Sequence, residues 1–241
     1  MNILVIGDAC RDVYIHGNSS RKNPEAAAPL LNNLITTVQD GMAANVANNL
    51  LALGADVHRI LPPEPWSEKE RYIDARYGTQ LLRVDYDQPS SPLDDLPDLA
   101  GYDAVVVSDY DKGFVSNYLL RYLDGKLPLF VDTKKRDLDF LRSAWVKVNQ
   151  LEAAALVSKP KNLVVTLGAM GSASGEHRAL SQPISVVDPC GAGDTYLAAF
   201  AWHMIQDPNN IGEAMNFANL AAAVTCRHRG TYAPTLEEIC G

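Results

Sequence analysis

One turn of the chain reads Asp188-Pro189-Cys190-Gly191-Ala192-Gly193-Asp194-Thr195 and joins a short apolar run, Ile184 to Val187, to a second apolar segment that ends near Met204. We predict a strand for the first run and a helix from Thr195 to Met204, because glycine and proline mark a sharp turn between them. A strand that turns directly into a helix is the repeating unit of α/β folds. This stretch therefore sets the fold class that we expect.

The same turn predicts a site for an anion. Small residues leave the backbone amides open at the start of the predicted helix, where the amides and the helix dipole favour negative charge. We expect Gly191, Ala192 and Gly193 to form an anion hole, and Asp194 to be the catalytic base that accepts the proton of an attacking hydroxyl. For Gly-x-Gly-Asp alone, an open alternative is a tight turn with Asp194 as an ordinary helix cap.

Outward from this turn, short apolar runs alternate with helical patterns along most of the chain. Continuous runs rich in Val, Ile and Leu suit strands that are buried on both faces of a parallel sheet. The further predicted strands are residues 3–6, 104–107, 129–131, 146–148 and 163–167, and the further predicted helices are residues 43–53, 116–123 and 211–227. The alternation predicts a doubly wound, mostly parallel α/β sheet flanked by helices.

Two segments depart from this rhythm. Residues 13–32 are polar and interrupted by glycine and proline, and residues 70–86 alternate around a turn at Gly78-Thr79. Both are typical of extended, half-exposed strands outside the main sheet. We expect them to form a small β-lid over one edge of a single domain that spans residues 1–241.

Composition and charge limit the classes of partner. The 241 residues are 47% hydrophobic and carry a formal net charge of −8, which argues against nucleic acid or an anionic membrane as the main partner. No run approaches the roughly 20 apolar residues of a membrane helix, and the first apolar run is expected to be a strand rather than a signal peptide. The four cysteines form no Cys-x-x-Cys pair, which favours reduced thiols and a cytoplasmic protein.

Several segments, in order along the chain, resemble the PfkB, or ribokinase-like, family of carbohydrate kinases. They are Val5-Ile6-Gly7-Asp8 with Asp12, Gly41-Met42-Ala43-Ala44-Asn45-Val46-Ala47, Asn149 with Glu152, Thr166-Leu167-Gly168, and the turn from Asp188 to Thr195. The resemblance implies a ribokinase-like fold and an ATP-dependent, Mg²⁺-dependent transfer of phosphate to a sugar hydroxyl.

Finer matches resemble the D-glycero-D-manno-heptose 7-phosphate kinases, the kinase domain of ADP-heptose synthases. They include Arg11-Asp12-Val13-Tyr14, Ser108-Asp109-Tyr110-Asp111-Lys112-Gly113 and Gln80-Leu81-Leu82-Arg83-Val84-Asp85. The chain is shorter than typical members, with gaps after Leu61 and after Leu156, and we expect no nucleotidyltransferase segment after Gly241. Met42 replaces the second glycine of a Gly-Gly pair, which predicts a reshaped acceptor pocket.

The resemblance assigns roles to individual residues. It implies that Asp12, Gly41 and Asn45 bind the sugar, that Asn149, Thr166, Gly168 and Asn219 bind ATP, and that Glu152 acts on Mg²⁺ through water, with Asp188 as a weaker metal candidate. Helix or turn capping is the alternative for Asp12 and Asn45, and a plain surface glutamate is the alternative for Glu152.

Basic residues of the predicted lid are candidates for binding a phosphate of the acceptor, because guanidinium groups match phosphate oxygens. They are Arg21, Lys22, Arg76 and Arg83, and for each one a solvated surface charge is the alternative. Lys112, in a turn that follows a predicted strand, is a further candidate for substrate binding.

The resemblance therefore implies a kinase that phosphorylates a sugar or sugar phosphate, with O1 of D-glycero-D-manno-heptose 7-phosphate as the acceptor and a homodimer that pairs the lids. A kinase for a different sugar and a catalytically degenerate sugar-phosphate sensor are the alternatives. A dinucleotide-binding oxidoreductase is rejected, because no Gly-x-Gly-x-x-Gly follows the first predicted strand.

Overall fold

Strand β1 (Asn2–Gly7) lies inside the larger of two sheets, and its side chains alternate between two separate hydrophobic clusters. Ile3 and Val5 belong to one cluster, and Leu4 and Ile6 belong to the other. This is the burial on both faces that a continuous apolar run predicts.

The structure, a computed structural model, describes residues 1–95 and 97–241.

The large sheet has the strand order β12-β11-β10-β9-β8-β7-β1-β4. Neighbours from β10 to β4 run parallel, and the pairs β10–β11 and β11–β12 at one edge are antiparallel. The other strands of this sheet are β4 (Asp56–Ile60), β7 (Ala104–Asp109), β8 (Leu129–Thr133), β9 (Trp145–Asn149), β10 (Asn162–Thr166), β11 (Ser172–Ser174) and β12 (His177–Ala179). The expected mostly parallel α/β sheet is confirmed, whereas β4 and the edge hairpin were not predicted.

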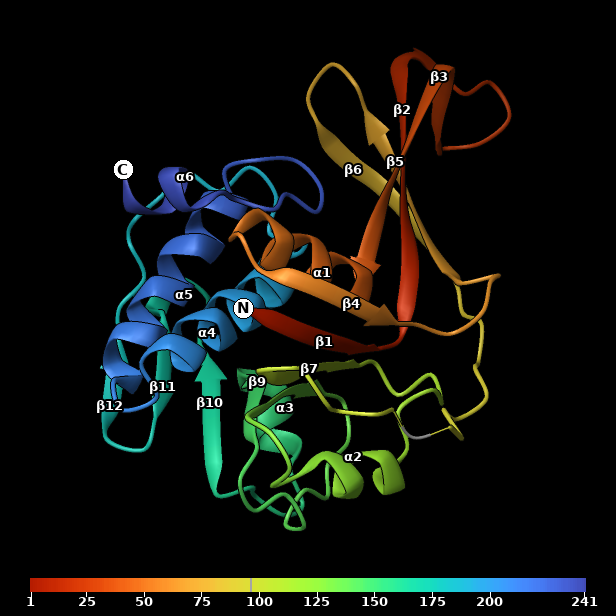
Figure 1. The fold of residues 1–241 in the computed structure, drawn as a ribbon. Helices are drawn as coiled ribbons and strands as arrows, with labels where there is room; N and C mark the ends of the chain where they lie inside the picture. Colours follow the sequence, from red (N-terminus) through yellow and green to blue (C-terminus); the bar gives the residue numbers. More distant parts are fainter. Residues whose placement is uncertain (96) are drawn as a thin grey trace.

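Helices cover both faces of this sheet (Figure 1). The side that buries Ile3 and Val5 is covered by α1 (Ala43–Ala52), α4 (Ala192–Gln206) and α5 (Ile211–Thr225), and the opposite side is covered by α2 (Asn117–Leu123) and α3 (Gln150–Ala155). A 3₁₀ turn, η1 (Gly168–Met170), follows β10, and a short helix, α6 (Leu236–Cys240), ends the chain. No helix among the described residues is long and apolar enough to cross a membrane.

The second, small sheet has the order β3-β2-β5-β6 and stands away from the large one (Figure 1). Its strands are β2 (Ala9–Lys22), β3 (Pro29–Met42), β5 (Ser67–Asp74) and β6 (Thr79–Tyr86). The expected small β-layer outside the main sheet is confirmed. Its strands are longer than residues 13–32 and 70–86, because β3 continues to pair with β2 until Met42 lies opposite Ala9.

The strand predicted for Ile184 to Val187 is wrong. This segment joins neither sheet of the described chain. Its end is held instead by the last turn of α5, where the amides of Val187 and Asp188 donate to the carbonyl of Cys226 at 2.8 and 3.3 Å. Ile184 and Val186 line a cavity. Short apolar runs do not distinguish a sheet strand from the wall of a pocket, which accounts for the error.

Candidate active site

The turn before α4 meets the carboxyl ends of β1, β7, β8 and β9, the edge of an open α/β sheet at which ligands usually bind. Gly191 is the N-cap of α4 and has a φ of +76°, in the left-handed region that favours glycine. A Cβ at this position would lie 2.9 Å from Asn45 Nδ2 and 3.2 Å from Thr231 Cα. The turn therefore depends on glycine, and it presents the first amides of α4 without side-chain obstruction.

Asp194 is buried in the first turn of α4, with 5% of its surface exposed. Its Oδ2 accepts a hydrogen bond from Asn45 Nδ2 at 2.9 Å, and its Oδ1 accepts one from the Tyr110 hydroxyl at 3.2 Å. Burial raises the pKa of Asp194 to about 6, although the Asn45 hydrogen bond opposes the shift. No side chain caps the start of α4, so Asp194 does not serve as a helix cap.

A lysine that we did not predict lies against the same turn. Lys147 is buried within β9, and its Nζ is 2.6 Å from Asp132 Oδ2 on the neighbouring strand β8. A Cβ added to Gly193 would lie 3.0 Å from the Lys147 ammonium. The signal for it in the sequence is a lone lysine inside an otherwise apolar strand, because a charge buried there needs a partner or a ligand.

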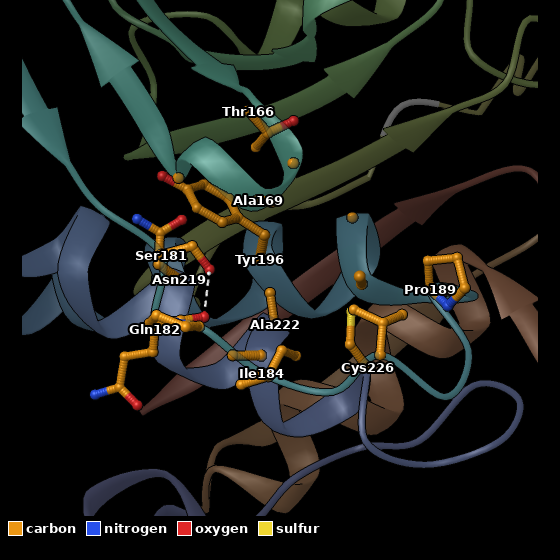
Figure 2. Close-up of a pocket in the computed structure, with 17 residues that line it drawn as sticks. Thr166, Ala169, Ser181, Gln182, Ile184, Pro189, Tyr196, Asn219, Ala222 and Cys226 are labelled. Carbon is orange, nitrogen blue, oxygen red and sulfur yellow. Dashed lines mark hydrogen bonds between the residues drawn. The ribbon is translucent and has the colours of Figure 1, made fainter.

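A cavity of about 480 Å³ opens beside the turn (Figure 2). Its walls are contributed by the end of β10, by η1, by the segment 181–189, and by α4 and α5. Five residues that we predicted for ATP or phosphate line it, namely Thr166, Gly168, Ala192, Gly193 and Asn219. Tyr196, Ala222 and Cys226 add apolar surface, and the combination of apolar walls with a few polar groups is typical of small-molecule sites.

Asn219 is fixed on the wall of this cavity. Its Nδ2 donates to the Ala179 carbonyl at 3.0 Å and to Ser172 Oγ at 3.2 Å. These bonds use the donor side of the amide, so its position is set before any ligand binds.

The small sheet brings Asp12 to the other side of the turn. Asp12 is buried on β2 and forms an ion pair with Arg71 of β5, a residue that we did not predict. A Cβ on Gly41 would collide with Asp12 Oδ2 and Cys10 Sγ, so glycine is needed there. Asp12 lies in a strand, and Asn45 lies inside α1, where it donates to Asp194, so neither side chain caps a helix.

Three basic residues share one face of the small sheet. Lys69 and Arg71 of β5 lie opposite Asp12 and Tyr14 of β2, and Arg71 lies opposite Arg83 of β6. Arg83 forms a two-pronged ion pair with Asp85 at 2.6 and 2.7 Å. The Tyr14 hydroxyl donates to Cys190 Sγ at 3.2 Å, so this face of the small sheet contacts the turn before α4.

Other predicted basic residues lie elsewhere. Arg21 and Lys22 are exposed at the end of β2, and Arg76 stacks over the ring of Tyr77 at 5.1 Å. Lys112 follows β7 and forms an ion pair with Asp87 at 2.6 Å. The structure therefore groups Arg83 with Lys69 and Arg71, and it does not bring Arg21, Lys22 or Arg76 into that group.

The proposed magnesium residues have partners within the protein. Asn149 and Glu152 form a capping box at the start of α3, with bonds of 2.9 and 2.7 Å, and Glu152 also pairs with Lys134. Both carboxylate oxygens of Asp188 accept backbone amides, from Cys190 at 2.9 Å and from Gly230 at 3.0 Å, so Asp188 holds the turn. Within residues 1–95 and 97–241, no group of three or more His, Cys, Asp or Glu side chains is placed to hold a metal alone.

Met42, which precedes α1, has an unusual backbone. Its φ is +56° and its ψ is −133°, a region that non-glycine residues rarely adopt, and its side chain is 2% exposed. It is absent from both hydrophobic clusters of the large sheet. The residue that replaces a glycine of the expected motif is thus buried at the junction between the small sheet and α1.

Comparisons with known proteins identify the class. The model of the pfkB family carbohydrate kinases matches residues 130–239. The chain is 30% identical to the D-beta-D-heptose 7-phosphate kinase of Bordetella bronchiseptica. The alignment is 298 positions long, and it covers 99% of this chain and 95% of that protein. It is 29% identical to the bifunctional protein HldE of a Nitratiruptor species, covering 98% of this chain but only 64% of that protein's length.

The structure is also similar to the ribokinase from Cryptococcus neoformans var. grubii serotype A in complex with ADP. The TM-score is 0.69 at 18% identity, and the match covers 99% of this chain and 98% of the ribokinase. At that identity the likeness shows the fold alone, which is the ribokinase-like α/β fold. The sequence matches place the chain in the pfkB family of carbohydrate kinases.

Proposed function

We propose that this carbohydrate kinase transfers the γ-phosphate of ATP to a hydroxyl of a sugar phosphate, with Asp194 as the base. The observation that carries the proposal is the buried Asp194 carboxylate beside the Gly191 turn, at a helix start that no side chain caps, together with the Lys147 ammonium. The acceptor O–H bond breaks and its proton moves to Asp194, while the acceptor oxygen bonds to phosphorus and the bond from phosphorus to ADP breaks. The amides and Lys147 stabilise the negative charge on the migrating group.

ATP is proposed for the cavity beside the turn. Its apolar walls suit a nucleoside, and its inner end includes Ala192 and Gly193, where phosphates would meet the start of α4. The ribokinase of Cryptococcus neoformans, which shares the fold, was solved with ADP.

Magnesium fits the neighbouring residues. Asp132 and Glu152 both approach Lys134, and Asp132 Oδ1 is buried without a hydrogen-bond partner among the described residues. Mg²⁺ usually takes one or two carboxylates and fills its other positions with water and substrate phosphates. We propose that these two carboxylates would hold the ion, which would neutralise phosphate charge, with Glu152 acting through water.

For the acceptor we propose D-glycero-D-manno-heptose 7-phosphate, phosphorylated at O1. The name of the Bordetella bronchiseptica relative supports the heptose, and the row of Lys69, Arg71 and Arg83 supports an acceptor that carries a phosphate of its own. Asp12 and Asn45 are proposed to contact the sugar hydroxyls. A kinase for a different sugar is the second candidate, and it is favoured by the buried Met42, which stands at the second position of the expected Gly-Gly pair.

A screen of acceptors with Mg-ATP tests the proposal. ADP release is expected with the heptose 7-phosphate and not with unphosphorylated heptose, because the basic row would lose its anion. Preference for another sugar phosphate would establish the second candidate. Thermal stabilisation by a sugar phosphate without any phosphoryl transfer would contradict the enzyme and identify a sensor.

The variant Met42→Gly tests whether this residue shapes the acceptor pocket. We expect the KM for heptose 7-phosphate to change by about tenfold or more while kcat is retained, because one methylene more or less in a binding pocket is typically worth about 1–3 kcal/mol. Asn33→Gly is the matched control, since Asn33 also has a positive φ, of +52°, but is exposed on β3. Equal KM values in Met42→Gly and wild type would exclude Met42 from the pocket.

We further propose a homodimer in which two small sheets pair. Val38 and Leu82 lie on one face by strand register, and they are 57% and 55% exposed. A mass of one chain in sedimentation at micromolar concentration would contradict this dimer.

All four cysteines are free thiols, which supports the proposal that the protein works in the cytoplasm.

A further inference from the structure

Tyr110, which follows β7, takes part in none of the steps described above, yet its hydroxyl donates to Asp194 Oδ1 at 3.2 Å. We propose that Tyr110 is a positioning residue of the reaction, whose hydroxyl orients Asp194 and favours the ionised carboxylate that accepts the proton. This inference rests on the proposed role of Asp194 as the base.

The backbone of Tyr110 is fixed by a buried carboxylate. Asp8, at the end of β1, accepts the amide of Tyr110 at 2.7 Å and the amide of Lys112 at 3.2 Å through the same oxygen, Oδ2. The amide of the intervening Asp111 donates to Asp109 Oδ1 at 2.9 Å. Two strand ends therefore hold the loop that carries the ring, so its hydroxyl does not have to be ordered when substrate binds.

The ring of Tyr110 is fixed as well. Lys69 Nζ of β5 lies 5.0 Å from the ring centroid, and Lys134 Nζ lies 4.8 Å from it. These contacts involve the face of the ring, which phenylalanine also has. A change to phenylalanine therefore removes the hydroxyl and keeps both lysine contacts.

The hydroxyl of Tyr110 acts as a donor at every pH of interest. Burial, followed by the nearby Asp194 charge, raises the pKa of the phenol well above its ordinary value. A protonated phenol cannot serve as the base, but it donates to a carboxylate, and a hydrogen bond to the charged form favours that form. Carboxylate oxygens have further lone pairs, so Asp194 still accepts a proton from substrate while it is held.

Several charged and polar groups face Asp194, and Tyr110 is one of two among the described residues whose side chains donate a hydrogen bond to it. These groups come from the elements that pack around the Asp194 carboxylate. They are Asn45 on α1, Cys10 on β2, Lys69 on β5, Tyr110 after β7, Asp132 on β8, Lys134 after β8 and Lys147 on β9. Burial and Asp132 favour the protonated acid, whereas Asn45, Lys147 and Lys69 favour the carboxylate. Loss of the Tyr110 hydroxyl therefore shifts this balance toward the acid.

The test is Tyr110→Phe, with Tyr122→Phe as its control. Tyr122 also has a lysine over its ring, Lys126 at 4.4 Å, and its hydroxyl donates to the Pro97 carbonyl at 3.1 Å, away from Asp194. In Tyr110→Phe we expect the acidic limb of the kcat profile to move up by about 0.4–1 pH unit, since a hydrogen bond of ordinary strength is removed. The rate should recover at high pH, and Tyr122→Phe should not shift the limb.

A second measurement separates this inference from the proposed function. Titration of the Asp194 side-chain carbon by ¹³C NMR, in protein without substrate, should show the same upward shift in Tyr110→Phe whatever the chain phosphorylates. An unmoved titration, or a rate that falls equally at every pH, would overturn the positioning role. Absence of turnover in wild type with a shifted titration would overturn the proposed function and leave the hydrogen bond to Asp194 established.

Discussion

Asp194→Asn is expected to bind ATP nearly as well as the wild-type chain and to lose turnover, with kcat lower by about 10²–10⁴-fold. Asparagine has almost the same shape and still accepts the hydrogen bond from Asn45, but it cannot take a proton from an acceptor hydroxyl. Single-turnover transfer from labelled ATP measures the chemical step, and a fluorescent nucleotide analogue measures binding. A retained kcat would exclude Asp194 as the base.

Stability provides the control for this variant. Because burial raises the pKa of Asp194 from its ordinary value of 3.8 to about 6, the protein favours the protonated acid. The stability contributed by that preference is present at low pH and is lost as the pH rises through about 6. Asp194→Asn should therefore be at least as stable as the wild type at pH 8. A loss of turnover with an unchanged melting transition would then be a chemical effect rather than a folding defect.

Lys147→Met is expected to lower kcat by about 10²–10³-fold, because it removes a buried cation beside the anion turn. The ammonium lies next to Gly193 and 2.6 Å from Asp132 Oδ2, beside the turn where we propose that charge builds on the migrating phosphoryl group. Since that charge grows in the transition state, kcat should fall more than the affinity for ATP. Steady-state kinetics with saturating acceptor measure both.

The matched control for Lys147 is Lys135→Met. Lys135 also pairs with a buried carboxylate, Asp109 on β7, at 2.9 Å. Each change removes a lysine that pairs with a buried acid, so each is expected to cost stability. Only Lys147 lies against the Gly193 turn, so a similar fall in kcat for both variants would show that lost stability, not lost charge stabilisation, is responsible.

The large sheet was predictable because local patterns decide it. The run Ile3 to Ile6, which lies in β1, is continuous and apolar. Because both faces of a parallel sheet are buried, this pattern is compatible with few structures besides a central strand. The same reasoning failed for Ile184 to Val187, where the apolar side chains line a cavity and lie on no sheet. The local sequence pattern indicates that a segment is apolar. The tertiary fold decides whether a sheet, a helix or a bound ligand packs against that segment.

The site was predictable only in part, for a related reason. Asp194 and its turn were predicted because the signal is contiguous, whereas Tyr110 and Arg71 became visible only through contacts between distant segments. Tyr110 lies 84 residues from Asp194, and Arg71 lies 59 residues from Asp12. The basic residues chosen on the sequence alone illustrate the limit, since strand register places Arg83 beside Arg71 and leaves Arg21 at an exposed strand end.

The most direct test of the central claim is the pH dependence of single-turnover phosphoryl transfer, measured from pH 5 to 8 with saturating Mg-ATP and acceptor. The account predicts a rate that falls in proportion to the ionised fraction of one group with a pKa near 6, and the disappearance of this dependence from the residual rate of Asp194→Asn. A wild-type rate that stays level across this range, or the same limb in Asp194→Asn, would contradict it.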